Sequence, residues 1–186
     1  MALTQTQNAT IKADIAANAD MNTIPANLDG AYAIAALYNL PASPAFNVWR
    51  TDAQTKDIFD AIDWAKYTPV DAPEATGIYT ARAMSIQTKQ MNLQNMLVGR
   101  DRIDASKLNI RAGLRDAVIQ IPAGVSGALV VAGGASGATV LNACVRTATR
   151  LEKLLSSAPV TTGTVAAGVM GFEGIVSPQE IEAARA

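Results

Sequence analysis

Two amphipathic helices between residues 86 and 121, joined by a polar turn, constrain the fold of this chain more than any other feature. The first helix carries apolar residues at seven- and four-residue spacing, which places them on one helical face. It is expected to end at Gly99, because glycine readily adopts the left-handed conformation that closes many helices. The apolar residues of that face are Tyr79, Ile86, Leu93 and Leu97.

The second helix follows a turn, residues 100–104, that is too charged to be buried, and either Asp104 or Ser106 can cap it. Two amphipathic helices joined by a short turn pack antiparallel. The sequence therefore predicts a mainly α fold, an antiparallel helical bundle with an extended N-terminal arm and a Gly/Thr/Val-rich C-terminal loop or hairpin. The apolar residues of the second helix are Leu108, Ala112, Leu114, Val118, Ile119 and Ile121.

Composition shifts along the chain divide it into three consecutive segments. Residues 1–24 are expected to form an N-terminal arm and helix, residues 25–157 a helical core domain, and residues 158–186 an extended loop or hairpin followed by a terminal helix. Thr10 is the expected cap of the first helix, which leaves residues 1–9 as an unpatterned arm.

Within the core segment the same signals predict helices over residues 31–40, 51–66 and 139–156, and a short strand or extended link over residues 46–49. The terminal helix is expected to begin at Ser177, where a capping-box pattern coincides with proline at the first helical position. The residues expected on the buried side of the helix over 51–66 are Ile58, Phe59, Ile62 and Trp64.

The composition argues against the common enzyme classes. The chain contains no histidine and a single cysteine, Cys144, which removes the usual general base, the Ser-His and Cys-His pairs and the commonest metal ligand. No enzymatic activity, metal or cofactor is therefore expected. The formal charge of −1 provides no general attraction to nucleic acid, and no apolar run is long enough to cross a bilayer. Aromatic residues make up only 5% of the chain, so association with neighbouring subunits is expected as an additional source of stability.

One glycine-rich motif suggests an alternative function. Residues 128–138 (ALVVAGGASGA) resemble the strand and glycine turn that open short-chain dehydrogenases, and a nucleotide-binding enzyme would use the turn from Gly133 to Gly137. However, the last glycine of that fingerprint falls on Thr139, and no acidic residue follows at the spacing that the ribose requires. A glycine-rich flexible or interface loop is the favoured interpretation. Whether residues 123–137 form helix, strand or loop stays open.

Two charge clusters are candidate sites. Asp57, Asp60 and Asp63 share a helix face and could hold a divalent cation, although the solvated face of an amphipathic helix accounts for them as well. Arg111 and Arg115 continue a basic stripe that begins at Lys107. This stripe is interpreted as a surface pairing with acidic neighbours or as a protein interface, and sequence-specific nucleic-acid binding is not expected.

The segment from 163 to 174 combines small, β-branched and exposed-type apolar residues without a helical period. It is either a poorly ordered loop in a free subunit or an element that lies across, or adds a strand to, a neighbouring subunit. The candidate interface residues are Val165, Val169, Met170 and Phe172, together with Arg111 and Arg115.

Four fragments resemble a set of small proteins encoded in the structural-gene modules of tailed bacteriophages, and together they cover most of residues 58–184. They are DAIDW at 60–64, ID at 103–104 leading into NIRAGL at 109–114, ATRLEKL at 148–154 and IVSPQEI at 175–181.

The resemblance implies a virion structural protein, in the first place a neck or tail component such as a head-to-tail connector or a tail-associated adaptor. It implies partners among portal, neck or tail subunits, a homo-oligomeric ring, no membrane, and location in the virion after synthesis in the host cytoplasm. Alternatives within the same setting are a capsid-surface, fibre-linked or assembly-factor protein. A helical bacterial adaptor protein unrelated to phage is a further alternative.

Overall fold

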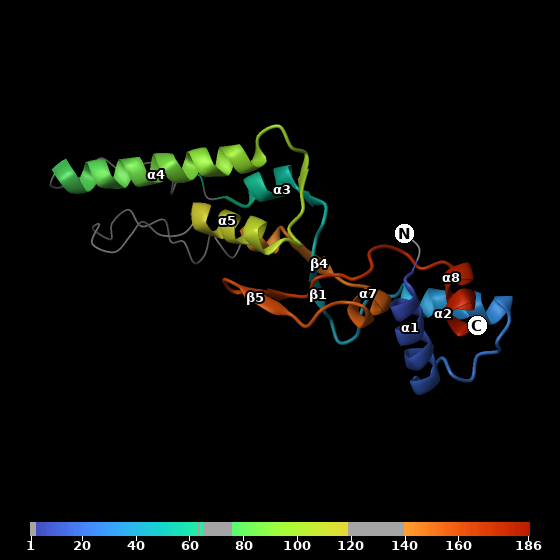
Figure 1. The fold of residues 1–186 in the computed structure, drawn as a ribbon. Helices are drawn as coiled ribbons and strands as arrows, with labels where there is room; N and C mark the ends of the chain where they lie inside the picture. Colours follow the sequence, from blue (N-terminus) through green and yellow to red (C-terminus); the bar gives the residue numbers. More distant parts are fainter. Residues whose placement is uncertain (1–2, 63, 65–75, 119–139) are drawn as a thin grey trace. The chain divides into compact units, whose positions relative to one another are not determined.

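The computed structural model describes residues 3–62, 64, 76–118 and 140–186. About half of the chain is helical, and small two-stranded antiparallel sheets accompany the helices (Figure 1). The helices are α1 (Gln5–Ala17), α2 (Leu28–Tyr38), α3 (Thr55–Asp60), α4 (Thr76–Leu97), α5 (Leu108–Val118), α7 (Arg150–Leu154) and α8 (Pro178–Arg185). The strands are β1 (Asn47–Trp49), β2 (Ala53–Gln54), β3 (Arg102–Ile103), β4 (Val145–Thr147), β5 (Val160–Thr162) and β6 (Val165–Ala167).

The chain forms two compact units, and this division differs from the three consecutive segments expected. Unit 1 consists of residues Met1–Val48, Thr147–Pro159 and Ala167–Ala186, whereas unit 2 consists of Trp49–Arg146 and Val160–Ala166. Both ends of the chain therefore contribute to unit 1. Strand β1 pairs with β4, β2 with β3, and β5 with β6.

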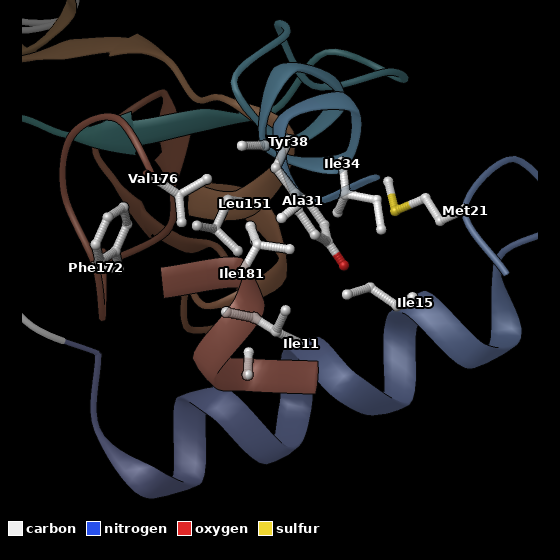
Figure 2. Close-up of a cluster of buried hydrophobic side chains, with 12 residues drawn as sticks. Ile11, Ile15, Met21, Ala31, Ile34, Tyr38, Leu151, Phe172, Val176 and Ile181 are labelled. Carbon is white, nitrogen blue, oxygen red and sulfur yellow. The ribbon is translucent and has the colours of Figure 1, made fainter. Parts of the chain in front are cut away.

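The core of unit 1 is built around α8, which packs against both α1 and α2. Figure 2 shows the apolar side chains of these helices converging with those of α7 and of the segment before α8. Burying such side chains contributes about 1.5–3 kcal/mol each, so the short helices of this unit stabilise one another. The largest members of the cluster are Ile11, Ile15, Met21, Ile34, Tyr38, Leu151, Phe172, Val176 and Ile181.

Helix α1 begins earlier than expected, so the prediction of an unpatterned arm over residues 1–9 is wrong for the described part of that range. Thr4 and Gln7 form a reciprocal capping box, with the Thr4 amide donating to Oε1 of Gln7 over 2.8 Å and the Gln7 amide donating to Oγ1 of Thr4 over 3.3 Å. Thr10, the expected cap, lies inside the helix and donates from Oγ1 to the Thr6 carbonyl.

The predicted start of the terminal helix is confirmed. Ser177 caps α8 through a capping box with Glu180, and Pro178 occupies the first helical position. The segment before it is held by Asn39, whose Nδ2 donates to the Val176 carbonyl and whose Oδ1 accepts from the Val176 amide, both over 3.0 Å. This two-point bracket ties the segment to the end of α2.

Helices α4 and α5 of unit 2 lie side by side and run antiparallel, as expected for the central pair (Figure 1). Leu93 and Leu97 are buried, and Gly99 has the predicted left-handed conformation with φ of 75°. The side chains of Tyr79 and Ile86, and the residues Ile119 and Ile121, lie outside the described part. Leu114 and Val118 are buried on α5, but Leu108 at its first position is exposed, contrary to expectation.

The helix expected over residues 51–66 is much shorter in the structure. Residues Ala53–Gln54 form β2, which pairs with β3 in the register Ala53↔Ile103, so the backbone is extended where a helical start was predicted. Helix α3 then covers only Thr55–Asp60. Trp64 is about half exposed rather than buried, and it stacks on Phe59 with 5.7 Å between ring centroids.

The helix expected over residues 139–156 is interrupted by β4 and resumes as α7. The new helix starts at Arg150 because Thr149 and Glu152 form a capping box there. Residues Val145–Thr147 instead pair with β1, which confirms the strand alternative predicted at 46–49.

Candidate interaction surfaces

The C-terminal segment from 163 to 174 takes the hairpin alternative and packs on its own chain. Strands β5 and β6 meet at a turn in which Gly163 has a φ of 62°. Val165 and Phe172 are buried and Val169 and Met170 are half-buried, so the first two do not form a free surface. The prediction that all four side chains face a neighbouring subunit is therefore wrong for Val165 and Phe172.

Polar contacts explain why this segment packs on its own chain, and the spacing of its apolar residues does not reveal them. Gln7 donates from Nε2 to the Gly171 carbonyl over 2.7 Å, and the Gly171 amide donates to the Leu155 carbonyl over 3.1 Å. The buried carboxylate of Glu152 accepts from the Thr149 amide with one oxygen and from the Gly174 amide with the other. These bonds provide within one subunit the backbone partners that were expected from a neighbour.

Arg111 was predicted as part of an exposed basic stripe, and this prediction is wrong because the side chain is 2% exposed. Its Nη1 donates to the carbonyls of Ala105 and Ser106 over 2.8 and 2.6 Å, and its guanidinium lies 4.5 Å from the ring centroid of Trp49. Burial lowers its pKa, and the charge of Asp104 opposes that shift. Arg111 thus fastens the turn before α5, whereas Arg115 is exposed.

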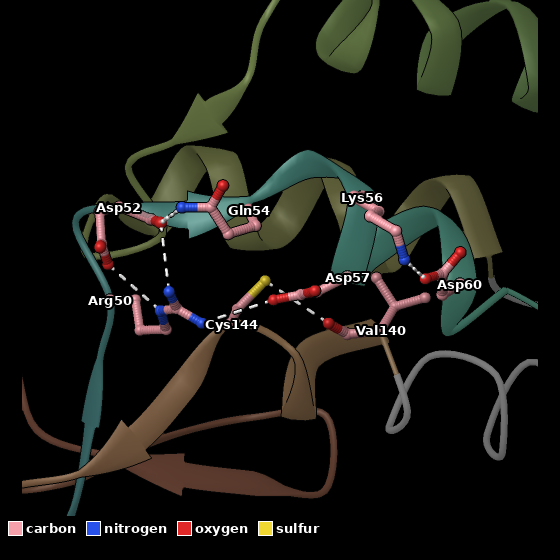
Figure 3. Close-up of polar contacts among 8 residues, drawn as sticks. All are labelled: Arg50, Asp52, Gln54, Lys56, Asp57, Asp60, Val140 and Cys144. Carbon is pink, nitrogen blue, oxygen red and sulfur yellow. Dashed lines mark hydrogen bonds and ion pairs between the residues drawn. The ribbon is translucent and has the colours of Figure 1, made fainter.

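The carboxylates considered for a cation are paired with basic side chains, as Figure 3 shows. Nη1 of Arg50 lies 3.7 Å from Oδ2 of Asp57, and Lys56 pairs with Asp60 one helical turn later. Asp63 lies outside the described residues. Within the described ranges no three His, Cys, Asp or Glu side chains are grouped as a metal site. The solvated-face interpretation accounts for Asp57 and Asp60.

Cys144 is fully buried and donates from Sγ to the Val140 carbonyl over 3.4 Å (Figure 3). Burial raises the pKa of this thiol to about 12, although the charges of Arg50 and Arg111 act in the opposite direction. The thiol is therefore neutral near neutral pH, which does not suit a nucleophile.

This burial predicts a loss of stability in alkali. The unfolded thiol ionises near its ordinary pKa of 9.0 and the folded one near 12, so the unfolded state is favoured increasingly between those values. Ionisation of this thiol should lower the free energy of unfolding by roughly 2 kcal/mol between neutral pH and about pH 10.5. Cys144→Ala should abolish this part of the loss. Urea unfolding of both proteins across this range measures it, and parallel curves for the two proteins would contradict the assignment.

Helix α4 presents apolar side chains on a second face that no described residue covers. Met84, Met91 and, directly after the helix, Val98 follow one another at seven-residue spacing and are 62%, 61% and 67% exposed. Met91 precedes the buried Leu93 by two residues, which is about 200° around the helix. Met84 and Met91 therefore lie on the side of α4 opposite Leu93, and among the described residues this side is exposed.

A groove of about 760 Å³ borders this face between α4 and α5. Lys89 crosses it and donates from Nζ to the Asp116 carbonyl over 2.7 Å, and burial lowers the pKa of that amine. The other lining residues are Met84, Thr88, Asn92, Asn95, Met96, Gly113 and Ala117.

Helix α2 of unit 1 also has an apolar side that no other residue in the described ranges covers. Its inner face contributes Ile34 and Tyr38 to the core, whereas Leu28 and Tyr32 are about half exposed, as is Leu40 just after it. A helix that is apolar all round is normally buried on all sides. The sequence contained this signal, since Asp29 is the one charged residue of α2.

No helix among the described residues has the length and apolarity needed to cross a membrane. The glycine turn at Gly133–Gly137 and the rest of the segment 123–137 lie outside the described part. Compared with known proteins, the chain matches no family model, no curated protein and no solved structure.

Proposed function

We propose that this chain is a structural subunit of a tailed-bacteriophage virion, a neck or tail component that acts as a head-to-tail connector or tail-associated adaptor. It acts through protein–protein contacts in a symmetric assembly and has no catalytic role. Its partners are copies of itself and portal, neck or tail subunits, and it reaches the virion after synthesis in the host cytoplasm.

The observation that carries the proposal is the second apolar face of α4. An exposed stripe at seven-residue spacing is typical of a helix that packs against another helix in a coiled-coil manner. The uncharged side chains beside the stripe, among them Gln87, Gln94 and Asn95, create no charge repulsion against a partner helix. We therefore propose that α4 and α5 are two members of an antiparallel helical bundle that neighbouring subunits complete.

A closed ring suits these surfaces. Rings use heterologous interfaces, in which different surfaces of one subunit meet. The open faces of α2 and α4 are two such surfaces. The resemblance of fragments between residues 58 and 184 to phage structural-module proteins supports the same setting.

Replacing Met84 and Met91 together by glutamate should dissociate the assembly, because burying two unpaired carboxylates at a subunit contact costs several kcal/mol. Native mass spectrometry at micromolar concentration measures the change. Both residues are solvent-exposed in the subunit, so its thermal unfolding should shift little. Asn109→Glu, an exposed polar position on α5, places a new charge away from the stripe and should leave the assembly intact.

Mass spectrometry of purified virions tests the setting directly, and absence of the chain from the particle would reject the proposal. Copy number then separates the alternatives. A ring gives roughly a dozen copies or fewer, a capsid-surface protein gives many more, and an assembly factor is missing from the mature particle.

A further inference from the structure

A polar hollow in unit 1 combines more positive than negative charge. It has a volume of about 200 Å³ and lies among α1, α2, α7 and the segment at Ser43. Its apolar lining includes Met21 and Leu154. Its polar wall consists of Asp14, Asn18, Tyr38, Ser43, Arg150 and Lys153.

Two basic residues of α7 line the same side of the hollow. Arg150 and Lys153 are three positions apart and therefore share a helix face. Helix α7 is anchored to the rest of unit 1, because Leu151 is fully buried and the Arg150 amide donates to the Leu40 carbonyl over 2.8 Å. Lys153 is also held at its tip, where Nζ donates to the Pro44 carbonyl over 3.1 Å.

The guanidinium of Arg150 has no hydrogen-bond or ion-pair partner within the described ranges. The carboxylate on the wall, Asp14, already accepts from the Tyr38 hydroxyl over 2.7 Å at Oδ2. Burial raises the pKa of Tyr38, and so does its bond to Asp14, so this hydroxyl remains a donor at neutral pH. The hollow therefore has a net charge of about +1 and an unused planar donor group.

A carboxylate fits this arrangement better than other anions. Its two oxygens can accept two parallel N–H bonds from one guanidinium, and the amide of Asn18 and the hydroxyl of Ser43 offer further donors. Asp14, which also lines the hollow, disfavours a dianion such as phosphate. The volume is below the roughly 300–1,000 Å³ of sites for larger ligands, which limits the ligand to one side chain or a very small acid.

We propose that this hollow binds a single carboxylate through Arg150, with Lys153 as the second cation. Given the proposed function, on which this part rests, the carboxylate belongs to an acidic side chain of a neighbouring subunit. A free small carboxylic acid is the other source of the same chemistry.

The binding step is tested with acetate and with a capped glutamate, N-acetyl-glutamate amide, by side-chain NMR of ¹⁵N-labelled protein at constant ionic strength. Both should shift the Arg150 Nε–H and Asn18 Nδ2–H signals saturably, with a Kd on the order of millimolar. Arg150→Gln should weaken binding at least tenfold, and Arg150→Lys, which keeps the charge without the fork, should weaken it less. Lys12→Gln, an exposed position on α1, should leave it unchanged.

Shifts that grow linearly, or that are equal in the wild type and Arg150→Gln, would overturn the inference. Inorganic phosphate binding more tightly than acetate would overturn the assignment to a singly charged ligand. If the NMR spectrum of Arg150→Gln shows that this variant is unfolded, binding by Arg150→Lys is compared with binding by the wild type instead.

Measuring assembly decides whether the bound carboxylate comes from a neighbouring subunit or from a free acid. Arg150→Gln should weaken assembly at least tenfold in native mass spectrometry if a neighbouring subunit supplies the carboxylate, and Lys12→Gln should not. Normal assembly of Arg150→Gln together with saturable acetate binding would assign the hollow to a free acid and reject the subunit source. Saturable binding by a chain that is absent from virions would reject the proposed function and retain the site.

Discussion

Leu93→Asp should unfold unit 2 or leave it aggregated. Leu93 is 1% exposed and belongs to α4, which packs against α5. Removing a buried leucine side chain costs about 2–5 kcal/mol, and an unpaired carboxylate in the same place costs several more. The sum approaches the whole stability of a domain, about 5–15 kcal/mol. Both tryptophans belong to unit 2, so the loss should appear as a red-shifted tryptophan emission and a lower melting temperature.

Gln87→Asp is the matched control for this change. It places the same charge on the exposed surface of α4, where the expected cost is about 0.5 kcal/mol of helix propensity. A soluble Leu93→Asp protein that melts like Gln87→Asp would show that Leu93 is not part of a core.

Gly30→Ala should destabilise unit 1 by at least about 3 kcal/mol, beyond the usual range for overpacking. A Cβ atom at this position would lie 2.0 Å from the carbonyl oxygen of Pro25 and 3.0 Å from Cγ2 of Ile24. The backbone cannot retreat easily, because Arg185 of α8 donates to the carbonyls of both residues over 2.9 and 2.8 Å. Chemical denaturation should show the loss, with reduced hydrogen-exchange protection of the α2 amides.

Gly113→Ala is the matched comparison, because it makes the same substitution of a glycine inside a helix. There the added Cβ meets only Cε and Sδ of Met96, the flexible end of a side chain, at 3.0 Å. Alanine is favoured over glycine inside a helix by up to about 1 kcal/mol, so this variant should be neutral or slightly more stable. Equal losses in the two variants would mean that helix packing in general, rather than the Pro25 carbonyl, limits position 30.

Local signals in the sequence predicted several elements well. Gly99 ends α4, Ser177 caps α8 and Leu93 is buried, because each depends on residues within about one helical turn or on a simple period. The cap of α1 was missed for a related reason. Thr4 and Thr10 are both acceptable caps, and only the partner Gln7 distinguishes them.

The remaining differences come from contacts between residues distant in sequence. Residues 53 and 54 are extended because they pair with β3, and the helix expected over 139–156 is broken because its middle pairs with β1. No periodicity encodes such pairings. Arg111 illustrates the same limit for the candidate site. Its four-residue spacing from Arg115 suggested a common exposed face, whereas Trp49 and the carbonyls at 105 and 106 bury it.

The order of segments in unit 1 has a consequence for synthesis. Helices α1 and α2 leave the ribosome first, but α8, which covers both, is separated from them by the whole of unit 2. Their apolar side chains therefore stay exposed until α8 has been synthesised, and contacts between residues so distant in sequence slow folding. A chain interrupted before Ser177 leaves Ile11 and Ile34 exposed, so unfinished chains should depend on chaperones and be removed by proteases until α8 is made.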